Sequence, residues 1–286
     1  MHATRKIAIL THAHDNFADY YLLNRIADIW RASGSEVVVL KGTGHFEPAD
    51  VLIVHVNLTV IPGEYRAFAA RYPVVINGLV RDISKRSISA NLINRRDSYT
   101  GPVIVKTNRN YGGQPERLFL PPTIPRRIMN KMQGLLPWSM ADHLTVDAYP
   151  ILASPRDVPR LVWFNPHLVV EKYLPEREGE YYALRLWVFF GEKEASFRLL
   201  SRNSIVKAGN TVHRESGLDI PDALRVLRKK LGFDYGKFDY GLVDGQCVLY
   251  DTNRTPSVSS SETGTLVATE LAKGLETVVP ASAGRG

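Results

Sequence analysis

The sequence predicts an α/β protein that begins with a small parallel lobe and continues with lobes of mixed strands and helices. Over roughly the first 80 residues, short apolar strands alternate with helices, which is the pattern of a parallel sheet covered by helices. Residues 238–251 contain two strand-like runs around Asp244-Gly245, the signature of an antiparallel hairpin. With 286 residues, 44% of them hydrophobic, the chain suits several lobes better than one layer.

Hydrophobic periodicity predicts the N-terminal elements. Residues 21–32 have apolar positions at helical spacing, with Gly34 as a stop signal, and residues 64–71 form a second predicted helix. Four short apolar runs predict strands, at residues 6–11, 36–40, 51–56 and 73–77. Strands separated by helices of this length favour a parallel order in the sheet.

The middle of the chain is less regular. A helix is predicted to start within residues 81–86 and to end near Ile93. Residues 102–106 form a buried-looking strand that ends in lysine, and the turn-rich residues 108–113 follow it. Residues 121–160 are rich in proline, so no regular element is predicted there.

The C-terminal half is dominated by predicted strands. Residues 221–231 form a basic helix, and residues 281–286 are a small, polar tail that we expect to be frayed. Five strands are predicted, at residues 168–171, 184–190, 194–200, 238–243 and 247–251.

Oxygen-bearing side chains gather on the predicted hairpin. Pairing across its turn places Asp239 and Asp251 near the same end, and Asp251 and Asn253 project to one face of an extended strand. Two carboxylates and an amide suit Mg²⁺, whereas Zn²⁺ prefers nitrogen and sulfur ligands. The alternative is that Asp251 and Asn253 only begin a turn before Pro256.

Composition narrows the class of protein. Cys247 is the only cysteine, which excludes an intrachain disulfide and favours a reducing, cytoplasmic location; we expect it in the core. No run approaches the ~20 apolar residues that span a bilayer, so no membrane partner is expected. The net charge of +7 favours anionic partners such as nucleotides, carboxylate substrates or nucleic acid.

Nucleic acid is the least favoured of these anionic partners. A nucleic-acid surface needs basic and aromatic residues gathered on one face. The basic residues are instead scattered along the chain, at Arg86, Arg95-Arg96, Arg126-Arg127 and Lys229-Lys230. We therefore expect no nucleic acid among the partners.

Five motifs along residues 80–275 together resemble the ATP-grasp superfamily. They are the strand, lysine and glycine-rich loop of residues 103–113, residues 169–174, residues 184–189, the Lys237-x-Asp239 pair and Asp251-x-Asn253-x-x-Pro256. The resemblance implies an ATP-grasp fold, in which two mixed α+β lobes clamp a nucleotide behind an N-terminal α/β lobe. It divides the chain into residues 1–80, 81–175 and 176–280, followed by a flexible tail at 281–286.

The resemblance also implies nucleotide-binding residues. Lys85 and Lys106 match lysines that reach the phosphates, and Gly112 and Gly113 look like a mobile loop over them, although a simple hairpin turn is the alternative. The segment Glu171, Lys172, Tyr173 and Leu174 is similar to the hinge whose backbone binds adenine. Glu178 or Glu180 is then expected to bind the ribose.

Asp239, Asp251 and Asn253 match the metal ligands of the superfamily. Asp251 stands where glutamate is more usual, and this shorter side chain favours one Mg²⁺ over two. Lys237 occupies the place of an arginine that stabilises the transferring phosphoryl group, and it lacks the bidentate fork of arginine.

Further cations lie on or between the strands before the metal ligands. Arg185 and Arg198, with Arg202 and Lys207, are candidates for contacts with phosphate or an acidic substrate. Each is equally well explained as an ordinary surface cation.

The implied activity is an ATP- and Mg²⁺-dependent ligase. Such an enzyme activates a carboxylate as an acyl phosphate and couples it to an amine, or to a thiol, with release of ADP and phosphate. Small-molecule or peptide substrates and a homodimer are expected from the resemblance. A phosphotransferase and a non-catalytic nucleotide-binding protein remain alternatives, because fold does not determine chemistry.

Two segments are candidates for substrate contacts. Residues 11–15 follow the first strand at its carboxyl end, where open α/β sheets bind ligands. Their two histidines, His12 and His14, also allow a metal site or an ordinary polar loop. Residues 257–261 follow the metal ligands and either contact the acceptor or form a flexible serine-rich linker.

Overall fold

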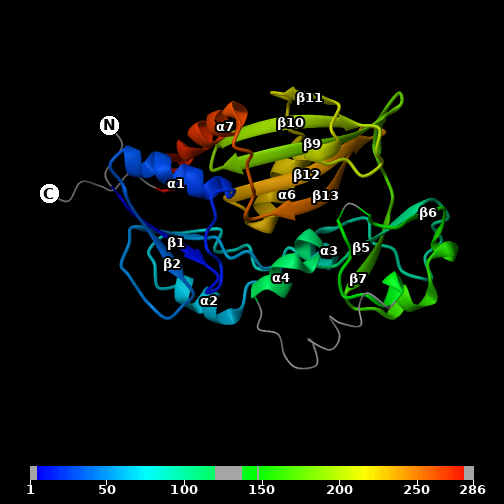
Figure 1. The fold of residues 1–286 in the computed structure, drawn as a ribbon, viewed down its shortest axis with the longest axis horizontal. Helices are drawn as coiled ribbons and strands as arrows, with labels where there is room; N and C mark the ends of the chain where they lie inside the picture. Colours follow the sequence, from blue (N-terminus) through cyan, green and yellow to red (C-terminus); the bar gives the residue numbers. More distant parts are fainter. Residues whose placement is uncertain (1–4, 120–136, 147, 280–286) are drawn as a thin grey trace.

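The computed structural model describes residues 5–119, 137–146 and 148–279, which form three sheets with helices on their faces (Figure 1). The predicted tail at residues 281–286 and part of the proline-rich segment 121–160 lie outside the described residues. None of the helices in the described part of the chain is long and apolar enough to cross a membrane.

The N-terminal sheet is parallel, as predicted. Its strand order is β2-β1-β3-β4, which leaves β1 in its centre. The strands are β1 (Lys6–Thr11), β2 (Glu36–Lys41), β3 (Val51–Val54) and β4 (Val75–Ile76), with the helices α1 (Leu22–Ala32) and α2 (Gly63–Ala69) between them. The alternation of strands and helices therefore predicted both the elements and their order.

Strand β4 has two residues, fewer than the predicted run at 73–77. Asn77 leaves the strand with a positive φ of 59°. Its backbone N–H donates to Asp234 at 2.7 Å, and its side-chain amide donates to the carbonyl of Tyr235 at 2.7 Å. A tertiary contact therefore ends the strand, which local sequence does not encode.

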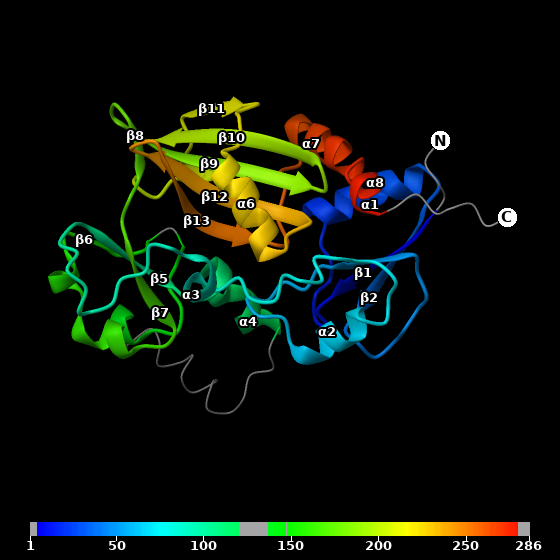
Figure 2. The same cartoon turned by 180° about the vertical axis from the view of Figure 1, so that it is seen from behind.

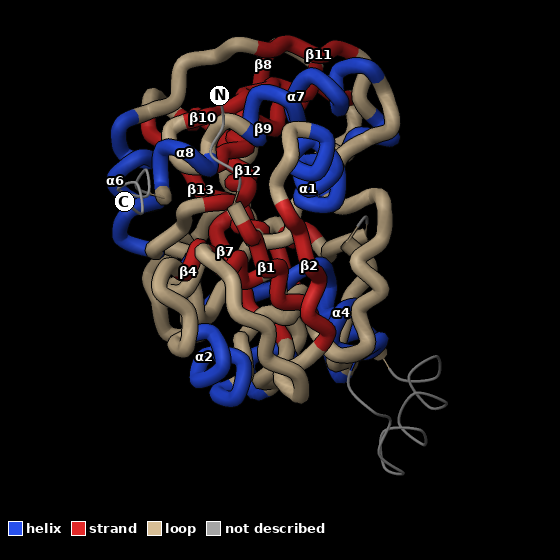
Figure 3. Tube along the Cα trace, turned by 90° about the vertical axis from the view of Figure 1, so that its left-hand side faces the viewer, coloured by secondary structure: helices blue, strands red, loops and turns tan. Residues whose placement is uncertain are grey.

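Helices α1 and α7 (Glu262–Ala272) pack side by side and join the N-terminal sheet to the large sheet (Figure 3). Trp30 of α1 donates its indole N–H to the carbonyl of Ala272 at 2.9 Å. Ile9, Phe190 and Leu271 belong to one buried cluster that contains residues of both sheets and both helices. The N-terminal lobe and the large sheet therefore share a hydrophobic core.

The middle sheet is antiparallel with the order β6-β5-β7. Its strands are β5 (Val103–Thr107), β6 (Ile151–Leu152) and β7 (Leu168–Lys172). Short helical segments surround it: α3 (Lys85–Ile88), η1 (Asn110–Gly113), α4 (Gln114–Phe119), η2 (Trp138–Met140), η3 (Pro155–Asp157) and η4 (Arg160–Phe164). The segments η2, η3 and η4 and strand β6 occupy the described part of the proline-rich region.

Helix α3 is shorter than predicted. It ends at Ile88, and Ser89 is already extended, with φ −85° and ψ 128°. Leu92 then forms a bridge to Glu171, and the Ile93 N–H donates to the carbonyl of Val170 at 2.9 Å. The apolar residues expected at the end of a helix thus pair with the edge of β7.

The large sheet is antiparallel and has the order β11-β10-β9-β12-β13, with β8 paired to β9. Helix α6 (Asp222–Leu231) lies against one face of it (Figure 2). The strands are β8 (Glu176–Glu178), β9 (Tyr181–Phe190), β10 (Lys193–Ser201), β11 (His213–Ser216), β12 (Tyr235–Val243) and β13 (Gln246–Asn253). The 3₁₀ turn η5 (Ala208–Asn210) precedes β11, and α8 (Leu275–Val278) ends the described chain.

The pleat of β9 separates two environments. Trp187 and Phe189 pack with Leu224 of α6 in one buried cluster. Leu184 and Leu186 project to the opposite face, because successive side chains of a strand alternate. This second face looks toward the middle sheet and the N-terminal lobe, and the candidate site lies on it.

The proposed lobe boundaries at residues 80 and 175 stay a prediction. The three sheets are built from strands within residues 6–76, 103–172 and 176–253. Cys247 is half-buried and packs against the cluster beneath α6, so its side chain borders the core.

Candidate functional site

Four polar residues share one face of the hairpin formed by β12 and β13. Lys237 lies opposite Asn253, and Asp239 lies opposite Asp251 in the register. Directly opposed residues have Cβ atoms about 5 Å apart, so the four side chains form one group, the polar hairpin face. A register shift after Asp239 marks a β-bulge, which re-aims the strand beyond it. The prediction that Asp239 and Asp251 lie near the same end of the hairpin is confirmed, and the bulge sets them directly opposite each other.

Lysines from two elements contact the carboxylates of this face. Lys85, at the start of α3, is almost fully buried, with its Nζ 2.6 Å from Oδ1 of Asp251. Lys237 Nζ lies 2.9 and 3.2 Å from the two carboxylate oxygens of Asp239. Burial lowers the pKa of Lys237, but the carboxylates of Asp239 and Asp251 outweigh burial and raise the pKa above its ordinary value.

A third lysine pairs with a glutamate on the middle sheet. Lys106 of β5 places its Nζ 2.6 Å from Oε2 of Glu171, on the neighbouring strand β7. Lys106 also donates to the carbonyl of Tyr250 at 3.4 Å, which links the middle sheet to the hairpin. Oε1 of Glu171 is buried without a hydrogen-bond partner. Buried polar atoms normally have hydrogen-bond partners, so this unpaired oxygen is an exception. It lies at the wall of a cavity, where it is an acceptor available to a ligand.

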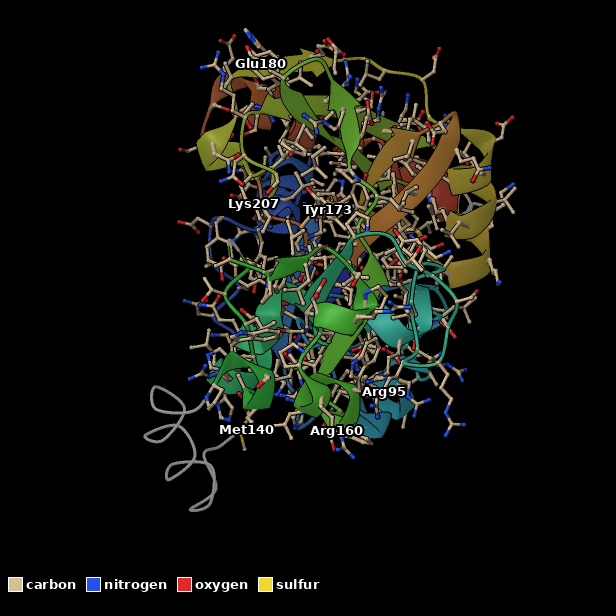
Figure 4. All side chains as sticks on the ribbon, turned by 90° about the vertical axis from the view of Figure 1, so that its right-hand side faces the viewer. Arg95, Met140, Arg160, Tyr173, Glu180 and Lys207 are labelled. Carbon is tan, nitrogen blue, oxygen red and sulfur yellow. The ribbon has the colours of Figure 1, made fainter. Side chains whose placement is uncertain are left out.

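The first cavity lies between the middle sheet and the large sheet. Tyr173 and Lys207 sit at this junction, whereas Glu180 lies at the outer end of the large sheet (Figure 4). The lining combines apolar side chains such as Ile104, Leu184 and Val206 with the charged and hinge residues named above. The predicted site residues in its lining are Lys85, Lys106, Glu171, Lys172, Tyr173, Leu174, Lys207, Asp239 and Asp251.

The second cavity, of about 1050 Å³, lies on the other side of the polar hairpin face. Lys237 and Asn253 line it, whereas Asp239 and Asp251 line the first cavity. Both predicted substrate segments also border it: His14 and Asp15 after β1, and Ser257 and Ser259 after β13. The polar hairpin face therefore stands between two cavities.

Arg185 and Arg198 are not brought to the site. They lie opposite each other on β9 and β10, on the face of the large sheet that carries Trp187. Both contact the buried carboxylate of Glu176, at 2.8 Å from Arg185 and 3.1 Å from Arg198. Burial acts to raise the pKa of Glu176, but its hydrogen bonds to Arg185 and to the Leu242 amide lower it. The expected contact with phosphate or substrate is corrected to a buried ion cluster on the far side of the sheet.

The acidic residues predicted to bind ribose line neither cavity. Glu178 is 2.5 Å from Arg198, and Glu180 is 3.1 Å from Arg202. Each of these carboxylates is thus paired with an arginine on the outer part of the large sheet, at the β8–β9 turn. The structure therefore does not place either carboxylate beside the hinge.

Gly112 and Gly113 do not face the first cavity. Both are buried with positive φ, and a Cβ on Gly112 would lie 2.6 Å from the carbonyl oxygen of Leu144. Close backbone packing thus requires glycine at 112. The adjacent Asn110 and Tyr111 line the second cavity. The predicted phosphate loop is therefore a 3₁₀ turn on the wall of the other cavity.

Thr59 and Arg254 were not singled out from the sequence. Arg254 is 1% exposed and donates to the carbonyls of Thr59 at 2.7 Å and Val80 at 2.8 Å. Burial lowers the pKa of Arg254 to about 9. The hydroxyl of Thr59 accepts from the Asn110 N–H, and its own N–H donates to Glu116, each at 2.8 Å. This network ties the end of β13 to the glycine turn, and no local pattern signals it.

The donor set of the polar hairpin face fits Mg²⁺. Two carboxylates and an amide supply hard oxygens and leave positions for water and phosphate. In the described ranges, histidine, cysteine, aspartate and glutamate form no cluster of three that holds a metal, so neither His12 nor His14 belongs to one. Asn253 Oδ1 accepts from the Thr255 N–H at 2.8 Å, so it also starts the turn considered as the alternative.

No protein-family model matches the chain, and neither does a curated protein sequence. Solved structures match over nearly the full length. A RimK domain ATP-grasp protein from Sphaerobacter thermophilus has a TM-score of 0.50 and 14% identity, covering 96% of this chain and 100% of its own. A D-alanine–D-alanine ligase from Bacillus anthracis has a TM-score of 0.47 and 12% identity, covering 97% and 96%. The first of these matches shows that the chain has the ATP-grasp fold, as its motifs imply.

Proposed function

We propose that the protein is an ATP- and Mg²⁺-dependent ligase that activates a carboxylate as an acyl phosphate and couples it to an amine. The observation that carries this proposal is the polar hairpin face between the two cavities. A nucleotide in the first cavity and an acceptor in the second would meet at this face. Positioning two reactants against fixed charges is the main source of catalysis in phosphoryl transfer.

The first cavity is the proposed nucleotide site. Lys85 and Lys106 reach it from the middle sheet and would neutralise phosphate charge. The backbone of the segment from Glu171 to Leu174 would bind the adenine, beside the free Oε1 of Glu171. The apolar lining from Ile104, Leu184 and Val206 would enclose the base. The ion pair of Lys85 with Asp251 and the hydrogen bond of Lys106 to the Tyr250 carbonyl show that both lysines extend toward the hairpin.

Asp239, Asp251 and Asn253 are the proposed magnesium ligands. These three side chains would hold Mg²⁺, whose positive charge would stabilise the transferring phosphoryl group. Lys237 lies on the same face and lines the second cavity, so it would contact the transferring phosphoryl group from the acceptor side. Its raised pKa keeps it cationic at neutral pH.

The second cavity is the proposed acceptor site. An acceptor carboxylate oxygen would attack the γ-phosphorus of ATP, and the bond to the ADP oxygen would break. An amine would then attack the acyl carbon, lose a proton and displace inorganic phosphate. The resulting product is an amide. Arg185 and Arg198 take no part, because they lie on the opposite face of the sheet.

Thermal unfolding with nucleotides tests the proposed nucleotide site. A ligand that binds only the folded protein raises its stability by RT ln(1 + [L]/Kd). We expect a rise with Mg-ATP and Mg-ADP that exceeds the rise with Mg-GTP and requires the metal. Lys106→Met and Asp239→Asn should lose most of it, whereas Lys193→Met, at a lysine paired with Glu270 away from both cavities, should retain it. The site assignment fails if millimolar nucleotide leaves the wild-type transition unchanged.

Phosphate release then distinguishes the ligase from its alternatives. A ligase releases inorganic phosphate only when both carboxylate and amine are present. A phosphotransferase yields ADP and a stable phosphorylated product with the acceptor alone. A regulatory nucleotide-binding protein shows the thermal shift with neither product.

A further inference from the structure

We propose that Arg214 is a specificity residue of the second cavity that binds an anionic group of the acceptor, remote from the reacting carboxylate. The acceptor class that this implies is an elongated acidic peptide. The inference rests on the proposed function, because it takes the second cavity as the acceptor site.

Arg214 projects from β11 toward the cavity. It pairs with Leu199 of β10, which pairs with Leu184 of β9. Directly opposed residues share a face, so Arg214 lies on the same face of the sheet as Leu184 and Leu186, away from α6. Its guanidinium carbon lies 4.7 Å from the centre of the Phe197 ring, and both residues line the second cavity. The ring supports a flat guanidinium in one orientation.

The charge of Arg214 is not neutralised by a neighbour. In the described part of the cavity wall, it is the one arginine or lysine without an acidic partner, because Lys237 contacts Asp239. Asp15, the acidic residue of the wall, is 2% exposed and accepts from the Phe17 N–H and the Tyr21 hydroxyl. A ligand in this cavity therefore meets an unpaired cation at the β11 end.

Arg185 and Arg198 show the contrast. They occupy the neighbouring strands on the other face of the sheet, and both contact Glu176. Burying a cation without a partner is costly, so these two arginines pair with a carboxylate. In a half-open cavity, an arginine stays hydrated without a partner and can bind an anionic ligand. The two faces thus use the same residue type differently: one for structure and one, we infer, for recognition.

The sheet geometry gives the length of the ligand. Arg214 is three strands from Lys237, and the register shifts their rows by four residues, from Leu184 to Val188. With about 4.8 Å between strands and about 3.4 Å per residue, the two Cα atoms are about 20 Å apart. An extended chain covers this distance in about six residues.

The size and lining of the cavity agree with a peptide. Its volume of about 1050 Å³ is at the upper end of the range for small-ligand pockets, about 300–1,000 Å³. Tyr20 and Tyr111 are exposed on its wall, and Val258 and Leu186 add apolar surface. Amphipathic aromatic residues suit an extended backbone with alternating side chains. The cation at one end specifies an acidic residue there.

Fluorescence anisotropy with defined peptides tests the inference. The probes are labelled six-residue peptides with glutamate at both ends, at one end or at neither, and serine elsewhere, in the presence of Mg²⁺ and a non-hydrolysable ATP analogue. We expect the doubly acidic peptide to bind about tenfold more tightly than either singly acidic peptide, because a charged hydrogen bond contributes that much. A peptide with its glutamates only one residue apart should bind like the singly acidic ones.

Arg214→Gln should abolish this preference and leave the thermal transition unchanged. Arg177→Gln is the matched control, since Arg177 is exposed and lies 4.7 Å over the ring of Tyr182 but lines neither cavity. It should keep the preference. The inference is overturned if the wild-type protein does not distinguish the peptides, or if Arg214→Gln distinguishes them equally well. The thermal shift with Mg-ATP, measured in the same samples, separates a failure of this inference from a failure of the proposed function. Absence of the shift in the wild-type protein would contradict the proposed function itself.

Discussion

Lysine–carboxylate pairs hold the candidate site together. Lys85, Lys106 and Lys237 contact Asp251, Glu171 and Asp239, respectively, each within 3 Å. A nucleotide that binds the lysines and a metal that binds the aspartates would have to exchange these partners. The Lys106–Glu171 pair is well shielded from water, and Lys85 is buried beside a partly exposed Asp251, so removing one partner leaves a charge that is available to a ligand.

Asp251→Asn tests this exchange at one residue. The substitution removes the anion that faces Lys85 and one of the proposed metal ligands. We expect the affinity for Mg-ATP to fall at least about tenfold, while metal-free ATP binds no more weakly than to the wild type. Calorimetric titration with Mg²⁺ and with EDTA measures both. Asp244→Asn, at the exposed turn of the same hairpin, is the control, and equal losses for the two forms of ATP would contradict the exchange.

His55 makes the stability of the N-terminal lobe dependent on pH. It is fully buried against Phe17 and Tyr21, and among the described residues neither ring nitrogen has a hydrogen-bond partner. Burial lowers its pKa from 6.5 to about 3. Between these values the unfolded chain binds a proton that the folded protein does not, so stability falls as the pH drops below about 6.5.

His55→Leu should remove this dependence. For the wild type, the contribution of His55 to the free energy of unfolding declines by about 2 kcal/mol from pH 7 to pH 5. Urea unfolding at the two pH values should show a correspondingly smaller decline in the variant. His45→Leu, at an exposed histidine, should decline like the wild type, and identical slopes for all three proteins would contradict the assignment.

At the scale of elements, the pleat of the large sheet decides which cations reach the site. Arg185 and Lys237 occupy neighbouring strands, β9 and β12, yet they project to opposite faces. Successive side chains of a β-strand project to opposite faces of the sheet. Side chains one position apart therefore face either the cavities or the core under α6. In the hairpin, a β-bulge decides the register at the site: the turn pairs Tyr240 with Leu249, and the shift after Asp239 brings Asp251 opposite it.

Arg185→Met should therefore affect stability and not ligand binding. The substitution leaves the buried carboxylate of Glu176 with fewer partners, which we expect to lower the free energy of unfolding by about 3 kcal/mol. The dissociation constant for Mg-ATP, measured well below the melting temperature, should stay within twofold. A large loss of nucleotide affinity with unchanged stability would contradict this and show that Arg185 contributes to nucleotide binding.

At the scale of the whole molecule, buried contacts join the three sheets. Trp30 links α1 to α7, and Arg254 links the end of β13 to Thr59 of the N-terminal lobe and to Val80. Thr59 in turn contacts Asn110 of the glycine turn. Parts of the second cavity that are far apart in sequence are thus held by one hydrogen-bonded network.

Arg254→Met should weaken this assembly. Two charge-assisted hydrogen bonds would be lost, and the Val80 carbonyl would lose its donor while the Thr59 carbonyl keeps the Ile83 N–H at 3.0 Å, so we expect a loss of stability of about 3 kcal/mol. We also expect a smaller thermal shift with Mg-ATP, because Asn253 precedes Arg254. Arg202→Met, at an exposed arginine, provides the comparison. Equal nucleotide-induced shifts in the two variants would show that the network does not position the ligands.

Predictions from the sequence succeeded where the determinants are local. The strand and helix order along the N-terminal lobe and the hairpin around Asp244-Gly245 follow from periodicity and a two-residue turn, whereas the direct opposition of Asp239 and Asp251 depends on the β-bulge. The early end of α3 was missed because residues 89–93 pair with β7, a contact between distant segments. Tertiary pairing outweighs weak local helix propensity.

The sequence by itself determined the element order of the N-terminal lobe and the nearness of Asp239 to Asp251 at one end of a hairpin, because both depend on periodicity and on one turn. The approach of Lys85 to Asp251 and of Lys106 to the Tyr250 carbonyl joins separate elements and depends on the tertiary structure. Only the tertiary structure decided that Arg185 and Arg198 bind Glu176, that Glu178 and Glu180 lie away from the hinge, and that the glycine turn borders the second cavity. These outcomes depend on which face of one sheet meets another lobe. That choice follows from packing across the whole chain, which no local pattern records.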